Sequence, residues 1–103
     1  MALPKMQRLT QSNEIREVLR SKHRYTSAPA RMFFIPSDKN QGCVIVPKRV
    51  SKKAVDRNRL KRQSLEFLRA RFQKKIYGRV VVHFVNKPED GFSLAKLWNK
   101  LDS

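Results

Sequence analysis

The chain has 103 residues and carries 24 Lys and Arg against 8 Asp and Glu, a formal net charge of +16. With 40% apolar and 31% charged residues, the composition is typical of a folded chain, here one domain over 1–103, and the charge favours nucleic acid or an anionic surface as partner. The sequence has no long apolar run, no apolar core of a signal peptide and no second cysteine beside Cys43. We therefore expect no spanning helix, no secretory leader and no internal disulfide, in a cytoplasmic protein with no membrane partner.

The first half of the sequence predicts one helix and two strands. SNEIREVLRS (12–21) is typical of a short helix, because its aliphatic residues recur at i, i+3 and i+4. ARMFFIP (30–36) is apolar and aromatic, and CVIVP (43–47) follows the turn-forming residues SDKNQG. We therefore expect two strands that pair as a hairpin.

The second half predicts helix, strand and helix. The pattern is helical over 51–76, with Ser51 as N-cap and Gly78 as the stop signal, and Leu60 lies on its apolar face. RVVVHFV (79–85) is β-branched and apolar throughout, which indicates a buried strand. SLAKLWNKL (93–101) has the spacing of a final helix, whose Trp is expected to anchor it in the core.

The order of these elements predicts the fold class. Helix, strand, strand, helix, strand, helix is typical of an α+β protein, here an α/β sandwich with a small central sheet of three to four strands and helices packed against it. A helix separates the strands at 43–47 and 79–85, so these two are expected to run parallel.

The most unusual segment of the sequence is its basic stretch. Residues 48–62 hold eight Lys and Arg and a single acid, Asp56. A solvated helix face normally interleaves Glu at i, i+4, so a merely solubilising role is disfavoured. Arginine offers paired donors to phosphate oxygens, which predicts a polyanion contact surface. The predicted contact residues are Lys48, Arg49, Lys52, Lys53, Arg57, Asn58, Arg59, Lys61 and Arg62.

A family resemblance rests on this stretch. VPKRVSKKAVDRNRLKR (46–62) resembles the RNR-motif region of the bacterial ribonuclease P protein subunit, and RLTQSNEIREVL (8–19), ARMFFI (30–35) and YGRVVVHFVNKP (77–88) are similar to that family's other segments, in the same order. The resemblance therefore extends over nearly the whole chain.

The resemblance implies a fold, partners and a division of labour. The family's sheet contains a left-handed βαβ crossover, against the usual right-handed rule. Its RNR region contacts ribonuclease P RNA, and its sheet and first helix hold the 5′ leader of precursor tRNA. The RNA subunit, with Mg²⁺, hydrolyses the phosphodiester, so this chain would have no catalytic residues. The Mg²⁺ would be held chiefly by the RNA, and the sequence singles out no carboxylate of this chain as a further metal ligand. The resemblance implies no obligatory protein partner.

The residues implied for the leader cleft are Phe33, Ile15 and Leu19. Phe33 matches an aromatic of the family's sheet, whereas Ile15 and Leu19 stand where the family often has Phe. Phe33 and Phe34 alternate on a strand, so either Phe33 points outward to stack on a base or both rings are packed.

Four other residues are weaker candidates for a functional role. His23 and Tyr25 lie in a basic stretch and line either a leader groove or an exposed loop. His83 and Cys43 have no partner at metal-ligand or catalytic spacing, so structural roles are expected for both.

Three other functions fit parts of the sequence. A ribosomal or ribosome-associated structural RNA-binding protein would share the charge and the small mixed fold. A DNA-binding module is disfavoured because the basic helix follows a strand rather than another helix. A freestanding nuclease is disfavoured by the lack of paired carboxylates suited to acid–base chemistry.

Overall fold

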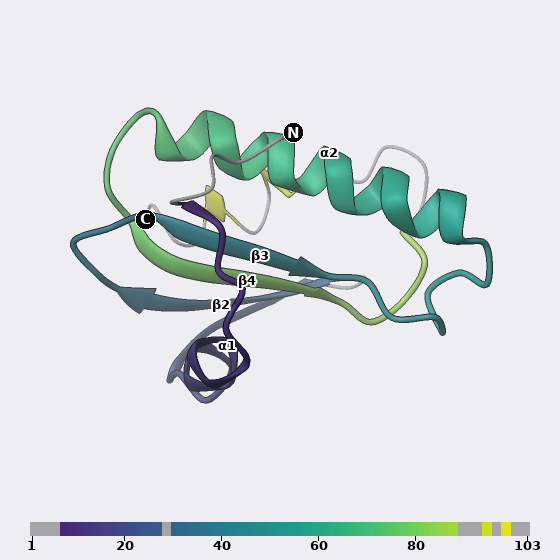
Figure 1. Ribbon diagram of the computed structural model, residues 1–103, viewed down its shortest axis with the longest axis horizontal. Coiled ribbons are helices and arrows are strands. Elements are labelled where there is room, and N and C mark those ends of the chain that lie inside the picture. The colour runs from purple at the N-terminus through teal and green to yellow at the C-terminus, as the bar shows by residue number, and fades with distance from the viewer. Residues whose placement is uncertain (1–6, 28–29, 89–93, 96–97, 100–103) are drawn as a thin grey trace.

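A mixed sheet separates two helices in the computed structural model, which describes residues 7–27, 30–88, 94–95 and 98–99 (Figure 1). The elements in these ranges are α1 (Ser12–Leu19), β1 (His23–Ser27), β2 (Ala30–Pro36), β3 (Gln41–Ile45), α2 (Ala54–Phe72) and β4 (Gly78–Phe84). The predicted α+β class is confirmed. No helix in the described part of the chain has the length and apolarity that a membrane crossing requires.

The strand order is β1-β2-β4-β3. β4 runs parallel to β3, as predicted, and antiparallel to β2. The predicted hairpin of β2 and β3 is therefore wrong, because β4 lies between them. Val80, Val81 and Val82 explain this position: they alternate faces and all three are fully buried, which only a central strand covered on both sides allows. The left-handed sense of the β3–α2–β4 crossover stays a prediction.

An additional strand, β1, forms one edge of the sheet. It pairs antiparallel with β2, with Tyr25 opposite Met32. The sequence HRYTS lacks the apolar alternation of a half-buried strand, so its pairing with β2, rather than its own pattern, defines it. The exposed-loop alternative for His23 and Tyr25 is wrong.

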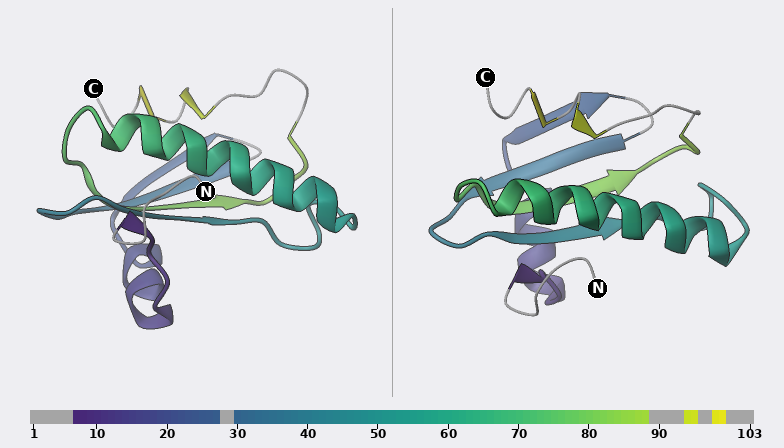
Figure 2. Two further views of the ribbon diagram at one scale, coloured as in Figure 1. Left: turned by 45° about the horizontal axis from the view of Figure 1, so that its top comes forward. Right: turned by 90° about the horizontal axis from the view of Figure 1, so that it is seen from above.

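The two helices cover opposite faces of the sheet (Figure 2). α2 packs on the face that presents Met32, Val80, Val82 and Phe84, whereas α1 packs on the face that presents Phe33 and Val81. Alternate residues of β2 and β4 thus serve two separate cores, as the period of two along a strand requires.

The helix α2 is shorter than predicted. It begins after Lys53 and ends at Phe72, so Ser51 is not its N-cap and Gly78 is not its stop signal. Asn40 explains the early end: its Nδ2 donates to the carbonyl oxygens of Phe72 and Lys75, at 3.1 and 2.9 Å. Gly78, at φ 128°, instead begins β4.

The predicted final helix lies partly outside the described residues. Ala95, Trp98 and Asn99 are helical, and the Trp98 N–H donates to the Leu94 oxygen at 2.9 Å. Trp98 is 1% exposed and packs edge-on against Phe67 and Tyr77. Its predicted role as a core anchor is confirmed.

Candidate nucleic-acid interface

The basic segment (residues 48–62) runs from the turn after β3 into the first turns of α2. Leu60 is half-buried against the sheet, and the helix face that carries Asn58, Arg59 and Arg62 is exposed, as predicted. Lys48, Arg49, Lys52, Lys53 and Lys61 are exposed too. The fold therefore gathers eight of the nine predicted contact residues as solvent-facing donors on the turn and the start of α2.

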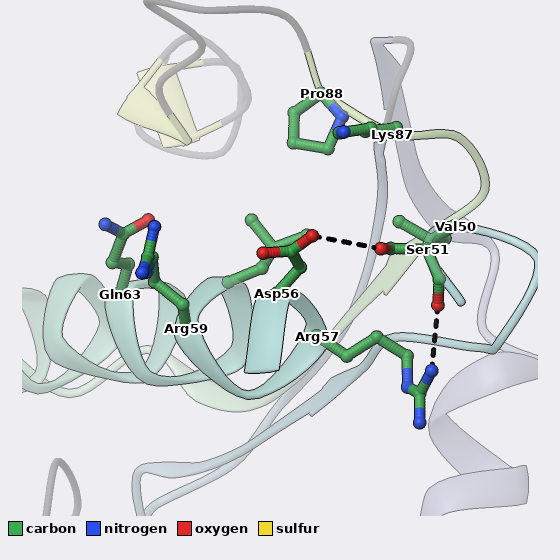
Figure 3. A pocket seen from close by; sticks show the side chains of 9 residues that line it. Val50, Ser51, Asp56, Arg57, Arg59, Gln63, Lys87 and Pro88 are labelled. Carbon is green, nitrogen blue, oxygen red and sulfur yellow. Dashed lines mark hydrogen bonds between the residues drawn. The ribbon is translucent and has the colours of Figure 1, made fainter. Parts of the chain in front are cut away.

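Arg57 is the exception, because it is half-buried and engaged within the protein. Its Nη1 donates to the main-chain oxygen of Ser51 at 2.8 Å. The Ser51 hydroxyl donates in turn to Asp56 Oδ2 at 3.3 Å (Figure 3). It also accepts from the Lys53 N–H at 3.3 Å. These bonds fix the turn before α2 against the first turn of the helix, so the exposed cations are held by an ordered backbone.

The orientation of α2 adds to the positive potential of this segment. The N-terminus of a helix carries partial positive charge on unpaired N–H groups and favours anions. Among the described residues, no side chain caps the N-terminus of α2. Lys52 and Lys53 flank this end, so side-chain and backbone donors face the same region of solvent.

The predicted cleft residues meet on the other face of the sheet. Ile15 and Leu19 of α1 pack against the cluster that contains Phe33 and Val81. Phe33 is only 7% exposed, which favours the packed alternative, and the Arg24 guanidinium carbon lies 5.7 Å from its ring centroid. The structure therefore brings Ile15, Leu19 and Phe33 together, with a cation over the aromatic ring.

Two basic residues outside the predicted set of Phe33, Ile15 and Leu19 line this face. Arg24, Thr26, Arg31 and Phe33 form a shallow pocket on β1 and β2. The signal for Arg31 was available, since it lies two residues before Phe33 and so shares its side of β2. Arg24 belongs to the basic stretch around His23 and Tyr25, for which a leader groove was one of two expectations, but its place over Phe33 depends on the unpredicted strand β1.

His83 lies next to Arg31 on this face of the sheet. The two residues are paired across β2 and β4. Partial burial lowers the pKa of His83, and the positive charges of Arg49 and Arg31 lower it further. Arg49 belongs to the basic segment, so the positive potential of that segment reaches the sheet.

Three other candidate residues have structural settings. Tyr25 packs against the core under α2, and the ring of His23 meets Phe34 edge-on at 5.9 Å. Cys43 packs against the core under α1, and burial raises the pKa of its thiol, with a smaller opposing effect from Lys61.

A protein-held metal site finds no support in the described ranges. No three His, Cys, Asp or Glu residues gather there in a group that could hold a metal ion. Mg²⁺ prefers an octahedral set of oxygen ligands, often completed by phosphates. The expectation that Mg²⁺ is held chiefly by the RNA therefore stays a prediction.

The chain matches a known protein family. The family model for Ribonuclease P matches residues 3–103. A search of curated proteins gives no match.

Proposed function

The chain belongs to the Ribonuclease P family, and from this premise we propose that it binds ribonuclease P RNA and the 5′ leader of precursor tRNA during tRNA 5′ maturation. The observation that carries the proposal is the exposed basic segment at the start of α2 in a chain matched by this family. The family supports membership of an endoribonuclease complex. A ribosome-associated RNA binder would share the charge, but the family match favours the ribonuclease P subunit.

We assign the contact with ribonuclease P RNA to the basic segment. Arg59, Arg62 and Lys61 are exposed on α2, while Lys52 and Lys53 flank its N-terminus. Each phosphate that such a residue neutralises releases a counterion, so binding weakens as salt rises. Asn58 adds a neutral donor and acceptor that suits a ribose, base or backbone contact.

We assign the contact with the leader to the face of the sheet beside α1. Ile15, Leu19 and Phe33 supply an apolar surface, and Arg24 and Arg31 supply phosphate donors beside it. The burial of Phe33 under Arg24 means that a base reaches the guanidinium plane before it reaches the ring. Arginine planes stack on unpaired bases, so Arg24 suits that contact.

The chemistry is proposed to belong to the RNA partner. Mg²⁺ bound by the RNA would stabilise charge on the phosphodiester during hydrolysis. This chain's cations would lower the repulsion between two polyanions and so favour substrate binding at low Mg²⁺. We propose a cytoplasmic setting and a single domain with no obligatory protein partner.

The leader contact is tested by comparing two substrates. Ribonuclease P RNA assembled with this protein should bind precursor tRNA with a leader more tightly than tRNA without one, in equilibrium titrations at fixed salt. Arg31→Ala should reduce that preference about 3- to 10-fold, the usual net value of one hydrogen bond. Arg69→Ala, an exposed change on the far part of α2, is the matched control. Equal affinity of the wild-type complex for both substrates would rule out leader binding.

A further inference from the structure

A small pocket lies between the first turns of α2 and the segment that follows β4. Its volume is about 170 Å³. Val50, Leu60 and Pro88 supply its apolar surface, with Val50 buried and the other two half-buried. Figure 3 places Pro88 across the gap from the side chains of α2. The depression is thus apolar inside, within the most basic part of the chain.

Charged residues stand at two sides of this pocket. Arg59 rises from α2, and Lys87 comes from the segment after β4 (Figure 3). Both side chains are exposed, so they are available to an anion outside the pocket. An apolar interior between two cations complements a nucleotide, whose base is flat and apolar on its faces and whose phosphate is anionic.

The polar groups inside the pocket distinguish among occupants. Asp56 and Gln63 lie on the same face of α2 as Arg59, at i, i+3 and i+7 spacing. A carboxylate accepts hydrogen bonds and has none to donate. The bond from Ser51 occupies Oδ2, at 3.3 Å, and orients the carboxylate. An acidic protein side chain would be repelled here, whereas an exocyclic amino group of a base would be accepted.

We propose that this pocket takes one unpaired RNA nucleotide whose base carries an amino group: adenine, cytosine or guanine. The base lies against Leu60 and Pro88 and donates to Asp56, while the phosphate reaches Arg59 or Lys87. This inference rests on the proposed function for the identity of the RNA, and adds a base-reading element to a surface otherwise described by phosphate contacts.

The test is a nuclear magnetic resonance titration of the full-length protein with AMP, CMP, GMP, UMP and inorganic phosphate. The methyl signals of Val50 and Leu60 report the pocket, and those of Val55, exposed nearby on α2 and outside the pocket, serve as control. AMP, CMP and GMP should shift the pocket methyls to saturation. UMP should bind about tenfold more weakly, because the carbonyl oxygens on both sides of the uracil N3–H repel the Asp56 carboxylate and offset that one donated bond. Phosphate should leave the pocket methyls unmoved.

The variant Asp56→Asn sharpens the test. An amide also accepts from Ser51, but it donates as well, so UMP should then bind as well as CMP. Three results would overturn the inference. The pocket methyls could respond to no nucleotide, they could respond to UMP as strongly as to CMP in the wild type, or they could respond to inorganic phosphate as strongly as to the nucleotides. Affinity for ribonuclease P RNA is measured on the same samples: RNA binding with a silent pocket refutes only the pocket, whereas absent RNA binding refutes the proposed function.

Discussion

Arg57 Nη1 donates to the main-chain oxygen of Ser51 at 2.8 Å, so one arginine of the basic segment holds the turn that precedes α2. Its neighbour two residues on, Arg59, is exposed and free to face a ligand. Two arginines of one short motif therefore have different physical roles. Arg57 holds the turn in position, whereas the exposed Arg59 is the one that we propose contacts the RNA directly.

This difference predicts separable effects of two substitutions. Arg59→Ala should lower affinity for ribonuclease P RNA and flatten the slope of log affinity against log salt by about 0.7–0.9, the value for one phosphate contact. Its free energy of unfolding should not change. Arg57→Ala should lower RNA affinity and also reduce the free energy of unfolding by about 1 kcal/mol, because a half-buried hydrogen bond is lost. Salt-series binding and urea denaturation check both. If the variant that combines Arg57→Ala with Arg59→Ala kept the wild-type salt slope, this helix would be excluded as the contact surface.

Asn40 is predicted to be the most sensitive buried polar residue of the fold. Besides its two donated bonds to the end of α2, its Oδ1 accepts from the N–H groups of Tyr77 and Gly78, at 2.6 and 3.1 Å. Asn40→Ala leaves these backbone groups unpaired and should cost about 2–4 kcal/mol of unfolding free energy. Asn86→Ala, at an exposed position, should cost less than about 0.5 kcal/mol. Comparable costs in urea denaturation would contradict the assigned role of Asn40.

Gly78 and Gly42 should differ in how well they tolerate an added Cβ. At Gly78, with φ 128°, an added Cβ would overlap the Ile35 oxygen and lie 2.6 Å from the Ser37 nitrogen, both in the backbone. At Gly42 it would meet the side-chain ends of Leu68 and Phe72, at 3.0 and 3.2 Å. Gly42→Ala should cost about 1–3 kcal/mol, the usual cost of overpacking. Gly78→Ala should cost more or prevent folding, since backbone must move. Thermal unfolding of the two variants measures these costs. A smaller loss of stability for Gly78→Ala than for Gly42→Ala would contradict the prediction.

His83 is predicted to make stability depend on pH. Its pKa is lowered in the folded protein, so the unfolded chain binds more protons in the window just below the ordinary pKa of about 6.5. The associated stability is present above that value and is lost as the pH falls through the folded pKa. His83→Gln should therefore lose less stability than the wild type between about pH 7.5 and 5. Urea denaturation at a series of pH values measures the free energy of unfolding of both proteins. If the two curves against pH ran parallel, His83 would not contribute to the pH dependence of stability.

The sequence predicted the elements better than their pairing. Valines 80–82 identified a buried strand, and the alternation of Phe33 and Phe34 located two faces, because both signals are local. The insertion of β4 between β2 and β3 depends on contacts between distant segments, and β1 is defined by β2. The same limit applies to the interface. The basic segment was readable as a run of charge, whereas the grouping of Arg24, Arg31 and Phe33 needed the sheet.

The central claim, a protein subunit that supports an RNA catalyst, is tested most directly by precursor-tRNA cleavage with ribonuclease P RNA at low Mg²⁺. The wild-type protein should raise kcat/KM well above that of the RNA alone. The double variant Arg59→Ala, Arg62→Ala should lose most of this gain while its unfolding free energy stays unchanged. Absence of any stimulation of the cognate RNA by the folded wild-type protein would contradict the claim.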